Sequence, residues 1–512
     1  MRAGAIRLLA AGFAALAWSC ASLPPLEGRP ESRALAATAD TRIGSAVAPL
    51  AAAHPGKTGI HPLPLGTDAF AARMALAAAA QRSIDAQYFI WHGDQTGLLL
   101  FEALAQAARR GVRVRILLDD QTSGDNQDIV LALGAESNIE VRYYNPFAHR
   151  RARMLDLGDF ARLNRRMHNK AFVVDNQAAV VGGRNIGNEY FGAGSAVPFM
   201  DLDVLAIGAV VPEVSAQFDL YWNSASAYPA RLLMGEATPE ARLTLEARFA
   251  VTRADADSLA YLERTRNTPL LAALLRRDLA LEWVNARVVS DDPAKTLDRT
   301  GRTDVLLLSK LIDGSVRSTF DLISPYFVPG NKGAAHLEKL ARSGIRIRVL
   351  TNSYSATDVS VVHSGYAKRR EELAAAGVRL FELKGTGEAA EREERAGSRS
   401  GSSPSSLHAK TFAADGERIF VGSFNFDPRS ALLNTEMGLV IESAALAGRL
   451  SAAFSTWIPE RAYEVRMRPD GGLEWIERLP SGEIRHETEP GVGGVRRAWL
   501  GFLSLLPIDW LL

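Results

Sequence analysis

The segments HNKAFVVD (168–175) and HAKTFAAD (408–415) follow one pattern, in which a Lys stands two residues and an Asp seven residues after a His. The same register continues into GGRN (182–185) in one case and GSFN (422–425) in the other. With nine His and nine Lys among 512 residues, chance would place a Lys two residues after a His only about 0.16 times. The two segments are therefore copies of one motif within a duplicated chain.

The sequence before each motif repeats as well. A β-branched run, a helix-like segment and an alternating run follow one another in each half, at 83–89, 98–110 and 111–118 and again at 320–327, 334–342 and 344–350. This order is typical of strands joined by helical crossovers, so two pseudo-equivalent mixed α/β domains are expected. Because residues two apart on a strand face the same side, the His and Lys of each motif are expected to point into one cleft.

The duplication suggests a division of the chain into six parts. These are a signal or lipoprotein segment (1–20), a linker (21–60), the first domain (61–229), a helical connection (230–304), the second domain (305–460) and a C-terminal extension (461–512). Residues 384–406 alternate Glu with Arg and then become rich in Gly, Ser and Pro, which predicts a flexible loop, with a mobile lid as the alternative.

The paired motifs suit the chemistry of a phosphodiester. The ammonium groups of Lys170 and Lys410, with the side chains of Asn185, Ser423 and Asn425, can bind the non-bridging oxygens as negative charge shifts. A neutral imidazole can attack phosphorus, and a second, protonated imidazole can give its proton to the leaving alcohol. Each half supplies one histidine for this purpose.

Asp175 and Asp415 complete the two motifs and are counted with the catalytic set. An Asp that closes a strand is often a turn former, however. These two residues are therefore expected to support the architecture rather than to touch the substrate.

The paired HxK(x)4D motifs resemble those of the phospholipase D superfamily, and the resemblance covers both halves. Finer features resemble one branch, the bacterial cardiolipin synthases of the C type, in the stretches GGRNIGNEYF (182–191), GSFNFDPRS (422–430) and LLPIDWLL (505–512). The resemblance implies two phospholipase D-like α/β/α domains with one active site shared at their interface. Neither a metal nor a cofactor is expected.

The resemblance also implies a covalent phosphohistidine intermediate. His168 is assigned as the nucleophile and His408 as the general acid and then base, although the pseudo-symmetry allows the roles to exchange. Glu436 falls where superfamily members place a carboxylate that orients the histidine ring. Asp201 is its nearest counterpart in the first half, with Asp203 as an alternative.

Two residues depart from the superfamily pattern. Gly183 stands where Ser is common, so the first half lacks one hydroxyl donor, and Asn188 stands where related sequences often have Asp. Neither change removes a catalytic group.

The N-terminus resembles an export signal. Arg2 and Arg7 accompany an apolar run at 8–18, too short to span a bilayer, and Cys20, the single cysteine, lies where bacterial lipoproteins carry their lipid. An ordinary cleaved signal is the alternative. Residues 496–506 combine Arg with Trp, Phe and Leu, as interfacial segments do, although a helix packed on the core has the same composition. An exported, membrane-associated lipoprotein facing the periplasm is expected.

These features predict a phosphatidyl transferase of the cardiolipin synthase type. Phosphatidylglycerol is the expected acceptor, and phosphatidylethanolamine or phosphatidylglycerol the donor. With water as acceptor the same site is a phospholipase D-type hydrolase. The expected partners are phospholipids and a membrane surface, with an accessory protein left open.

A secreted nuclease and a catalytically idle lipid-binding module are the rival hypotheses. The net charge of +1 argues against nucleic acid as a partner, and the intact motifs in both halves argue against an idle module. A group of arginines before His168 is expected to approach the site and to suit lipid phosphates, namely Arg150, Arg151, Arg153, Arg162, Arg165 and Arg166.

Overall fold

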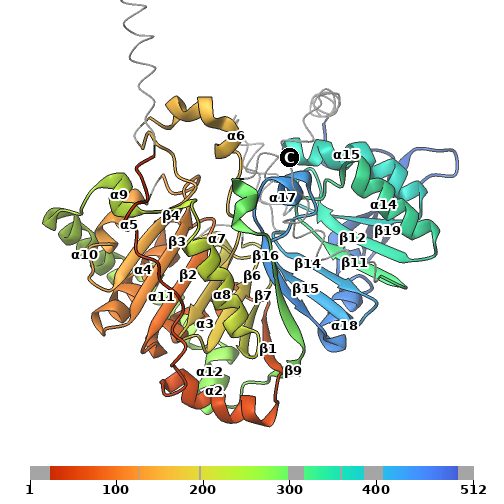
Figure 1. The fold of residues 1–512 in the computed structure, drawn as a ribbon. Coiled ribbons are helices and arrows are strands. Elements are labelled where there is room, and N and C mark those ends of the chain that lie inside the picture. Colours follow the sequence, from red (N-terminus) through yellow and green to blue (C-terminus); the bar gives the residue numbers. More distant parts are fainter. Residues whose placement is uncertain are drawn as a thin grey trace, which may run out of the picture.

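Two β-sheets form the centre of the molecule (Figure 1). The computed structural model describes residues 23–124, 126–150, 152–194, 198–297, 316–357, 360–385 and 407–493. Cys20 and the segments 386–406 and 496–506, on which expectations were placed above, lie outside the described residues.

The first sheet contains strands β1 (Thr58–Leu63), β2 (Ser83–Tyr88), β3 (Arg113–Asp119), β4 (Ile139–Tyr144), β5 (Ala171–Val174), β6 (Ala178–Gly182), β7 (Asp203–Gly208), β8 (Ala227–Pro229) and β9 (Glu282–Val284). Their order across the sheet is β8-β4-β3-β2-β5-β6-β7-β1-β9. β2, β3 and β4 run parallel, whereas β5 pairs antiparallel with β2.

The second sheet contains β10 (Ala286–Ser290), β11 (Thr319–Ile323), β12 (Arg346–Asn352), β13 (Arg379–Leu383), β14 (Lys410–Ala414), β15 (Arg418–Gly422), β16 (Met437–Ile441), β17 (Ala462–Met467), β18 (Leu473–Leu479) and β19 (Gly482–His486). Its order is β10-β16-β15-β14-β11-β12-β13-β17-β18-β19. The six strands β13-β12-β11-β14-β15-β16 repeat the order and directions of β4-β3-β2-β5-β6-β7, which confirms the duplication.

Helices cover both sheets. The first half has α2 (Arg42–Ala53), α3 (Gly66–Ala79), α4 (Gln95–Arg109), α5 (Gln127–Leu133), η1 (Arg153–Asp159), α6 (Phe160–Leu163), α7 (Asn188–Phe191) and α8 (Val211–Trp222). The connection has α9 (Ala230–Met234), α10 (Pro239–Ala254), α11 (Ala256–Arg266), α12 (Pro269–Arg276) and η2 (Pro293–Thr296). The second half has α14 (Gly330–Arg342), α15 (Ser360–Ala375), α17 (Pro428–Leu432), α18 (Ala444–Ala453) and α19 (Ile458–Arg461). No helix of the described part is long and apolar enough to cross a membrane.

Both faces of each sheet are buried, which gives the expected α/β/α layering. In β5, Phe172 and Val174 pack into the core with α3 and α4, whereas Ala171 and Val173 pack on the opposite face. In the second half, α14 and α15 cover one face of the sheet, and α18 and α19 contribute to the other.

The two halves pack together through their central strands. Small and β-branched residues of β5, β6 and β7 form one buried cluster with residues of β14, β15 and β16. Ala179 and Val181 of β6 belong to this cluster, as do Val421 of β15 and Leu439 of β16. This contact brings the starts of β5 and β14, and thus the two motifs, to the same interface.

Two of the six expected parts have a different content in the structure. The described residues 230–297 hold four α-helices and the short η2, but β9 pairs with β1 and β10 pairs with β16, so this connection also adds a strand to each sheet. In the C-terminal extension, β17 pairs with β13 and is followed by β18 and β19. The second sheet therefore continues past residue 460, because the edge of β13 gains partners from the extension.

Candidate active site

The two motifs are held in place by main-chain contacts between the halves. The backbone N–H of His168 donates to the carbonyl of Thr435 at 2.8 Å, and that of His408 donates to the carbonyl of Met200 at 2.9 Å. Thr435 belongs to the second half and Met200 to the first, so each histidine is fixed by the opposite domain. The strands begin only at Ala171 and Lys410, so the histidines stand just outside them.

Each histidine faces a carboxylate of the other half. The Nδ1 atom of His168 lies 2.8 Å from Oε2 of Glu436, and Nδ1 of His408 lies 2.6 Å from Oδ2 of Asp201. Asp203, the alternative to Asp201, instead pairs with a buried arginine of the first core at 2.9 Å. With Nδ1 as the donor to a carboxylate, the Nε2 atoms of both rings are left for chemistry.

The two lysines fold back toward their own motifs. Lys170 Nζ donates to the carbonyl of His168 at 2.6 Å, and Lys410 Nζ donates to that of His408 at 2.5 Å. Both lysines are buried. Burial lowers the pKa of Lys170 well below its usual range, although Glu436 opposes the shift. Unlike the sequence expectation, each ammonium is held by its neighbouring carbonyl, from which an anionic phosphate can draw it.

Burial also sets the state of the histidines. It holds the pKa of His168 well below its usual range, and the positive charges of Lys170 and Lys410 add to this effect. Burial and Lys410 lower the pKa of His408 to about 3, with Asp201 opposing the shift. Both lysines act on both rings, which shows that the two motifs share one site. A bound phosphodiester anion would offset the lysine charges and raise both histidine pKa values.

The two carboxylates differ in their electrostatics. Burial alone would raise the pKa of Asp201, but His408 and Lys410 outweigh it and lower that pKa to about 2. Burial raises the pKa of Glu436 to about 7, with Lys170 opposing the shift. His408 therefore faces the more firmly ionised carboxylate, the arrangement that best supports an imidazolium.

The raised pKa of Glu436 predicts a pH-dependent stability. Between about pH 4.5 and pH 7 the folded chain binds more protons at this site than the unfolded chain, so this contribution to stability is lost as the pH rises. Glu436→Gln cannot ionise, so we expect it to raise the free energy of unfolding at pH 8 by up to about 3 kcal/mol. In denaturant unfolding the gain should shrink toward pH 5, and an equal difference at both pH values would contradict the assignment.

Gly183 and Ser423 are equivalent in the duplication but act differently. The Ser423 hydroxyl donates to Glu436 Oε2 at 2.5 Å, whereas a Cβ added at Gly183 would lie 2.2 Å from Asp201 Oδ1. The missing hydroxyl of the first half is thus explained by space, since the Asp201 carboxylate occupies it. Asp201 Oδ1 accepts instead from the backbone N–H of Leu202 at 2.7 Å.

We expect Gly183→Ala to lower the transfer rate by about tenfold or more, because the new methyl group must push the Asp201 carboxylate away from His408. Gly448→Ala in α18 is a matched control, because a Cβ there meets no atom within 4 Å. Initial rates and thermal midpoints of both variants check this. A wild-type rate for Gly183→Ala would show that the carboxylate position is not critical.

Asp175 and Asp415 make the structural contacts expected of turn-forming residues, and their place in the catalytic set stays a prediction. Asp175 accepts from the backbone N–H groups of residues 81–83, and Asp415 accepts from those of residues 317–319. Both adopt left-handed conformations, with φ of 52° and 57°. Each tightens the turn after its motif strand against the start of the neighbouring strand, as a turn-forming Asp does.

Asp175→Ala is expected to lower the free energy of unfolding by about 3 kcal/mol, because it leaves three backbone N–H groups, one buried and two part-buried, without their acceptor. Asp175→Asn keeps one side-chain oxygen and tolerates the left-handed backbone, so its loss should be smaller. Urea unfolding measures both variants. A rate per folded molecule as low as that of a histidine variant, at unchanged stability, would instead make Asp175 catalytic.

The three expected substrate donors are not equivalent. Asn185 Oδ1 accepts from the Ile90 N–H at 3.2 Å and its Nδ2 donates to the Tyr190 hydroxyl at 3.0 Å. Ser423 donates to Glu436, so both residues position other groups in this structure, and their assignment as substrate-binding stays a prediction. Asn425 Oδ1 is buried without a hydrogen-bond partner among the described residues. Asn425 therefore remains the candidate for a polar contact with substrate.

Aromatic contacts to the histidines were missed by the sequence analysis. Phe89 meets the His168 ring edge-on with centroids 5.0 Å apart. Tyr190 and Phe199 lie 5.1 and 5.3 Å from the His408 ring. Tyr190 belongs to the motif segment 182–191 and Phe89 to the repeated run 83–89, whereas Phe199 belongs to no motif or repeat. These rings help to exclude water from both imidazoles.

The arginines before His168 are mostly engaged by protein groups rather than left for lipid phosphates. Arg150 and Arg153 pair with Asp120, Arg162 with Asp159 and Arg166 with Asp119, while Arg165 donates to the carbonyl of Lys295. Arg151 lies outside the described residues. This cluster fastens the chain that leads into the first motif.

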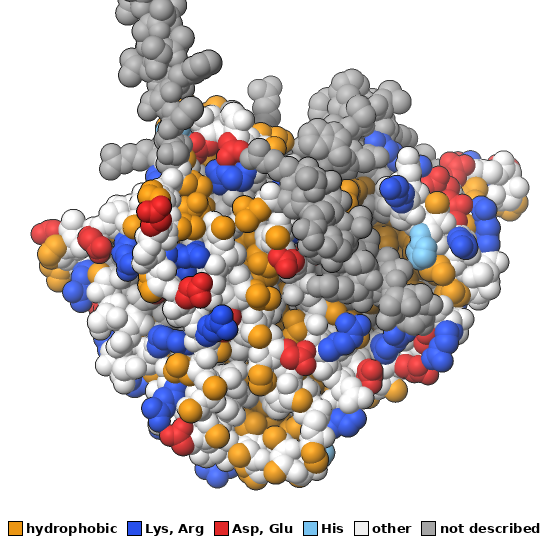
Figure 2. Space-filling model, viewed as in Figure 1, with side chains coloured by type: hydrophobic (Ala, Val, Ile, Leu, Met, Phe, Trp, Pro, Cys, Tyr) orange, Lys and Arg blue, Asp and Glu red, His pale blue; other side chains and the backbone are white. Residues whose placement is uncertain are grey.

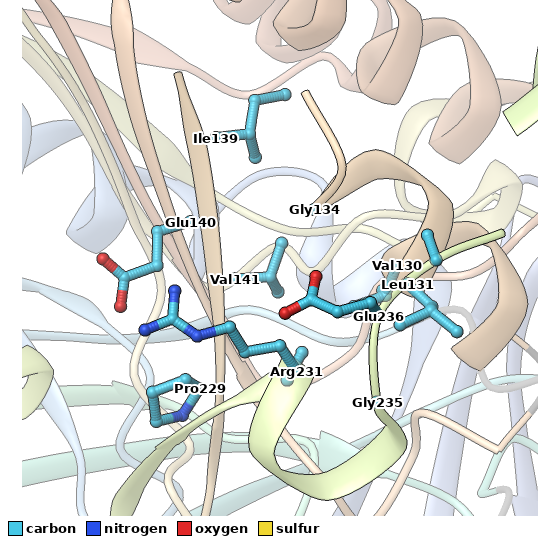
Figure 3. A pocket seen from close by; sticks show the side chains of 12 residues that line it. Val130, Leu131, Gly134, Ile139, Glu140, Val141, Pro229, Arg231, Gly235 and Glu236 are labelled. Atoms are coloured by element: carbon cyan, nitrogen blue, oxygen red, sulfur yellow. The ribbon is translucent and has the colours of Figure 1, made fainter. Parts of the chain in front are cut away.

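Other parts of the described structure do not add to this site. Figure 3 shows a hollow lined by residues of β4, α5 and the region of α9, including Glu140 and Arg231 but neither histidine. Within the described residues no group of three or more His, Cys, Asp or Glu side chains is placed to hold a metal ion.

A family model described as "Cardiolipin synthase, PLD-like domain" matches residues 74–200 and 308–458, which contain the two motifs. The chain belongs to this family. Cardiolipin synthase C of Escherichia coli (strain K12) is 45% identical over 476 residues, 92% of this chain and 100% of that protein. An uncharacterized protein of Helicobacter pylori (strain J99) is 32% identical over 417 residues, 80% of this chain and 81% of its own length.

A solved structure shares the fold of this cardiolipin synthase family member. The phosphatidylserine synthase of Haemophilus influenzae Rd KW20 matches with a TM-score of 0.53 and 13% identity, covering 82% of this chain and 91% of that one. At this identity the likeness concerns the fold alone. It agrees with the two pseudo-equivalent domains described above.

Proposed function

We propose that this chain is a phosphatidyl transferase of the cardiolipin synthase type, which transfers a phosphatidyl group from phosphatidylethanolamine or phosphatidylglycerol to phosphatidylglycerol through a phosphohistidine. The observation that carries the proposal is the exchange of carboxylates, which leaves two oriented imidazoles beside two lysines in one buried site. The 45% identity to cardiolipin synthase C supports phospholipids as substrates.

The first half-reaction uses His168 as the nucleophile. Glu436 accepts a hydrogen bond from the Nδ1–H of His168, so the Nε2 lone pair can attack the phosphorus of a donor phospholipid. The bond from phosphorus to the head-group oxygen breaks, and His408, protonated once the anionic substrate has bound, gives its Nε2 proton to that oxygen. Lys170 and Lys410 stabilise the charge on the non-bridging oxygens.

The second half-reaction reverses the roles at His408. The hydroxyl of phosphatidylglycerol gives its proton to the now neutral Nε2 of His408 and attacks phosphorus. The P–N bond to His168 breaks, and cardiolipin leaves. Asp201 stabilises the imidazolium that forms on His408. Water in place of phosphatidylglycerol would give phosphatidic acid by the same steps.

Attachment to a membrane outside the cytoplasm is part of the proposal. It is supported by the sequence around Cys20, which resembles a lipid-attachment site. The mass of the mature N-terminus, compared with that of a Cys20→Ala variant, tests it. A mature protein without lipid would leave the enzymatic proposal standing and remove this part.

The activity is tested with purified protein in mixed vesicles of phosphatidylglycerol and phosphatidylethanolamine, with lipids followed by mass spectrometry. Cardiolipin that depends on His168 would support the transferase, and omission of each lipid in turn would identify the donor. Phosphatidic acid alone would make the chain a phospholipase. Degradation of DNA without lipid turnover would overturn the proposal in favour of a nuclease.

A further inference from the structure

The element formed by η1 and α6 exposes apolar side chains where a surface segment normally exposes polar ones. Met154, Leu155 and Phe160 are 79%, 63% and 46% exposed. A surface helix of a soluble protein turns such residues toward the core. Three large apolar side chains within seven residues therefore form an exposed patch on this element.

One carboxylate of the same element, Asp156, faces the protein, whereas that of Asp159 is 43% exposed and pairs with Arg162. Asp156 is buried, accepts from the backbone N–H of His149 at 2.9 Å and lies 2.5 Å from its Nδ1. Asn145 Nδ2 donates to the carbonyls of Arg162 and Arg165 at 2.9 and 2.6 Å. The base of the element is thus fixed by hydrogen bonds, and its apolar tip is held outward.

The support of this element is also the support of the first motif. Arg166 pairs with Asp119 at 2.7 Å, with both side chains fully buried. Asp119 also accepts the backbone N–H of Met167 at 2.8 Å, and His168 follows directly. Phe160 precedes His168 by eight positions, and the buried Arg166–Asp119 pair lies between them. The position of the exposed apolar side chains is therefore coupled to that of the catalytic histidine.

The second half adds to the same end of the molecule. Figure 1 shows α6 and α17 at the same, upper end, and Arg429 of α17 donates to Asn164, which follows α6, at 2.6 Å. Leu432, the last residue of α17, is 54% exposed. In Figure 2, hydrophobic, basic and acidic side chains are visible together at this end. Apolar side chains of both halves thus lie around the shared site.

The charge of the segment is compatible with an anionic surface. Residues 150–166 contain six arginines and two aspartates. Four of these arginines pair with carboxylates, Arg150 and Arg153 with Asp120, Arg162 with Asp159 and Arg166 with Asp119, so only a small positive excess remains. Exposed apolar groups beside arginines are the composition that binds at the interface of an anionic bilayer. Soluble monomeric proteins rarely expose neighbouring large apolar side chains, and such patches mark interaction sites.

We infer that the η1–α6 element docks on a phospholipid bilayer, with Met154, Leu155 and Phe160 inserted among the lipids, and so presents the paired histidines at the level of the lipid phosphates. The inference rests on the proposed lipid substrate. It gives this enzyme a membrane contact near its site, separate from any anchor at the N-terminus.

The test uses the full chain with Cys20→Ser, so that a single introduced cysteine can carry an environment-sensitive fluorophore. Met154→Cys is the probe, and Leu243→Cys, at a residue of α10 that is 71% exposed, is the matched control. Vesicles of phosphatidylglycerol and phosphatidylethanolamine should raise the emission at 154 about twofold or more with a blue shift, and brominated acyl chains should quench it. The probe at 243 should not respond.

A second probe, Phe160→Cys, keeps the test valid if the first variant folds poorly. No response at either position, or an equal response at 243, would overturn the inference, and the patch would then fit a protein partner. Repeating the measurement with His168→Ala separates docking from catalysis. A response at 154 without lipid turnover would support docking while the proposed function fails, and cardiolipin formation without a response would do the reverse.

Discussion

Replacement of His168 by alanine is expected to reduce phosphatidyl transfer by about 10⁴-fold or more, because it removes the imidazole assigned to form the covalent intermediate. His408→Ala should cause a comparable loss with a natural phospholipid, whose alkoxide leaving group needs a proton. Equal losses would not by themselves distinguish the nucleophile from the acid. The leaving group of the substrate can make that distinction.

In a phosphatidyl ester of p-nitrophenol the nitrophenolate leaves without protonation, so only the nucleophile is needed for the first step. With this substrate His408→Ala should form a phosphohistidine that turns over slowly, and His168→Ala should form none. Intact-protein mass spectrometry and the release of one equivalent of nitrophenol measure both outcomes. Accumulation of the adduct in His168→Ala instead would assign the nucleophile to His408.

The exchanged carboxylates predict the second large effect. Asp201→Asn is expected to lower transfer by about 10²- to 10⁴-fold, since an amide cannot stabilise the imidazolium of His408 as an ionised carboxylate does. Because His408 acts as the base in the second half-reaction, the nitrophenyl ester should still give a rapid burst with this variant, followed by a slow steady state.

Glu436→Gln is the matched comparison and should change the other step. It disturbs the ring of His168, so the burst itself should be slower. Rapid-mixing absorbance at the nitrophenolate band separates the two phases for both variants. A slow burst in Asp201→Asn with a normal burst in Glu436→Gln would mean that each carboxylate serves the histidine of its own half.

The register of the two motifs was sufficient to predict the duplication and its mixed α/β halves. The α/β/α layering, the shared site and the orienting role of Glu436 were implied by the resemblance to the phospholipase D superfamily. The sequence could not indicate which histidine ring Glu436 serves. The contact with His168 arises from packing between the two domains, and the two residues are 268 positions apart in the chain. The contact of Ser423 with Glu436 could not be predicted for a similar reason, since a motif gives the residue type and not the group that its hydroxyl meets.

Other parts lacked a signal in the sequence. β9 has only three residues, and β17, β18 and β19 lie in the expected C-terminal extension. β9 pairs with the edge of β1 and β17 with the edge of β13, and these edges exist only after each sheet has formed. Phe199 likewise contacts His408 through the fold alone.

The pairing of His168 with Glu436 and of His408 with Asp201 makes each half an incomplete enzyme. A mutation of the carboxylate in one half impairs the histidine of the other half, so the sequences of the two halves cannot change independently at these positions. A single half would regain both pairs only as a symmetric dimer, in which each copy lends its carboxylate to its mate. Fusion into one chain keeps the two halves in equal amounts and allows their sequences to diverge, as Gly183 and Ser423 have.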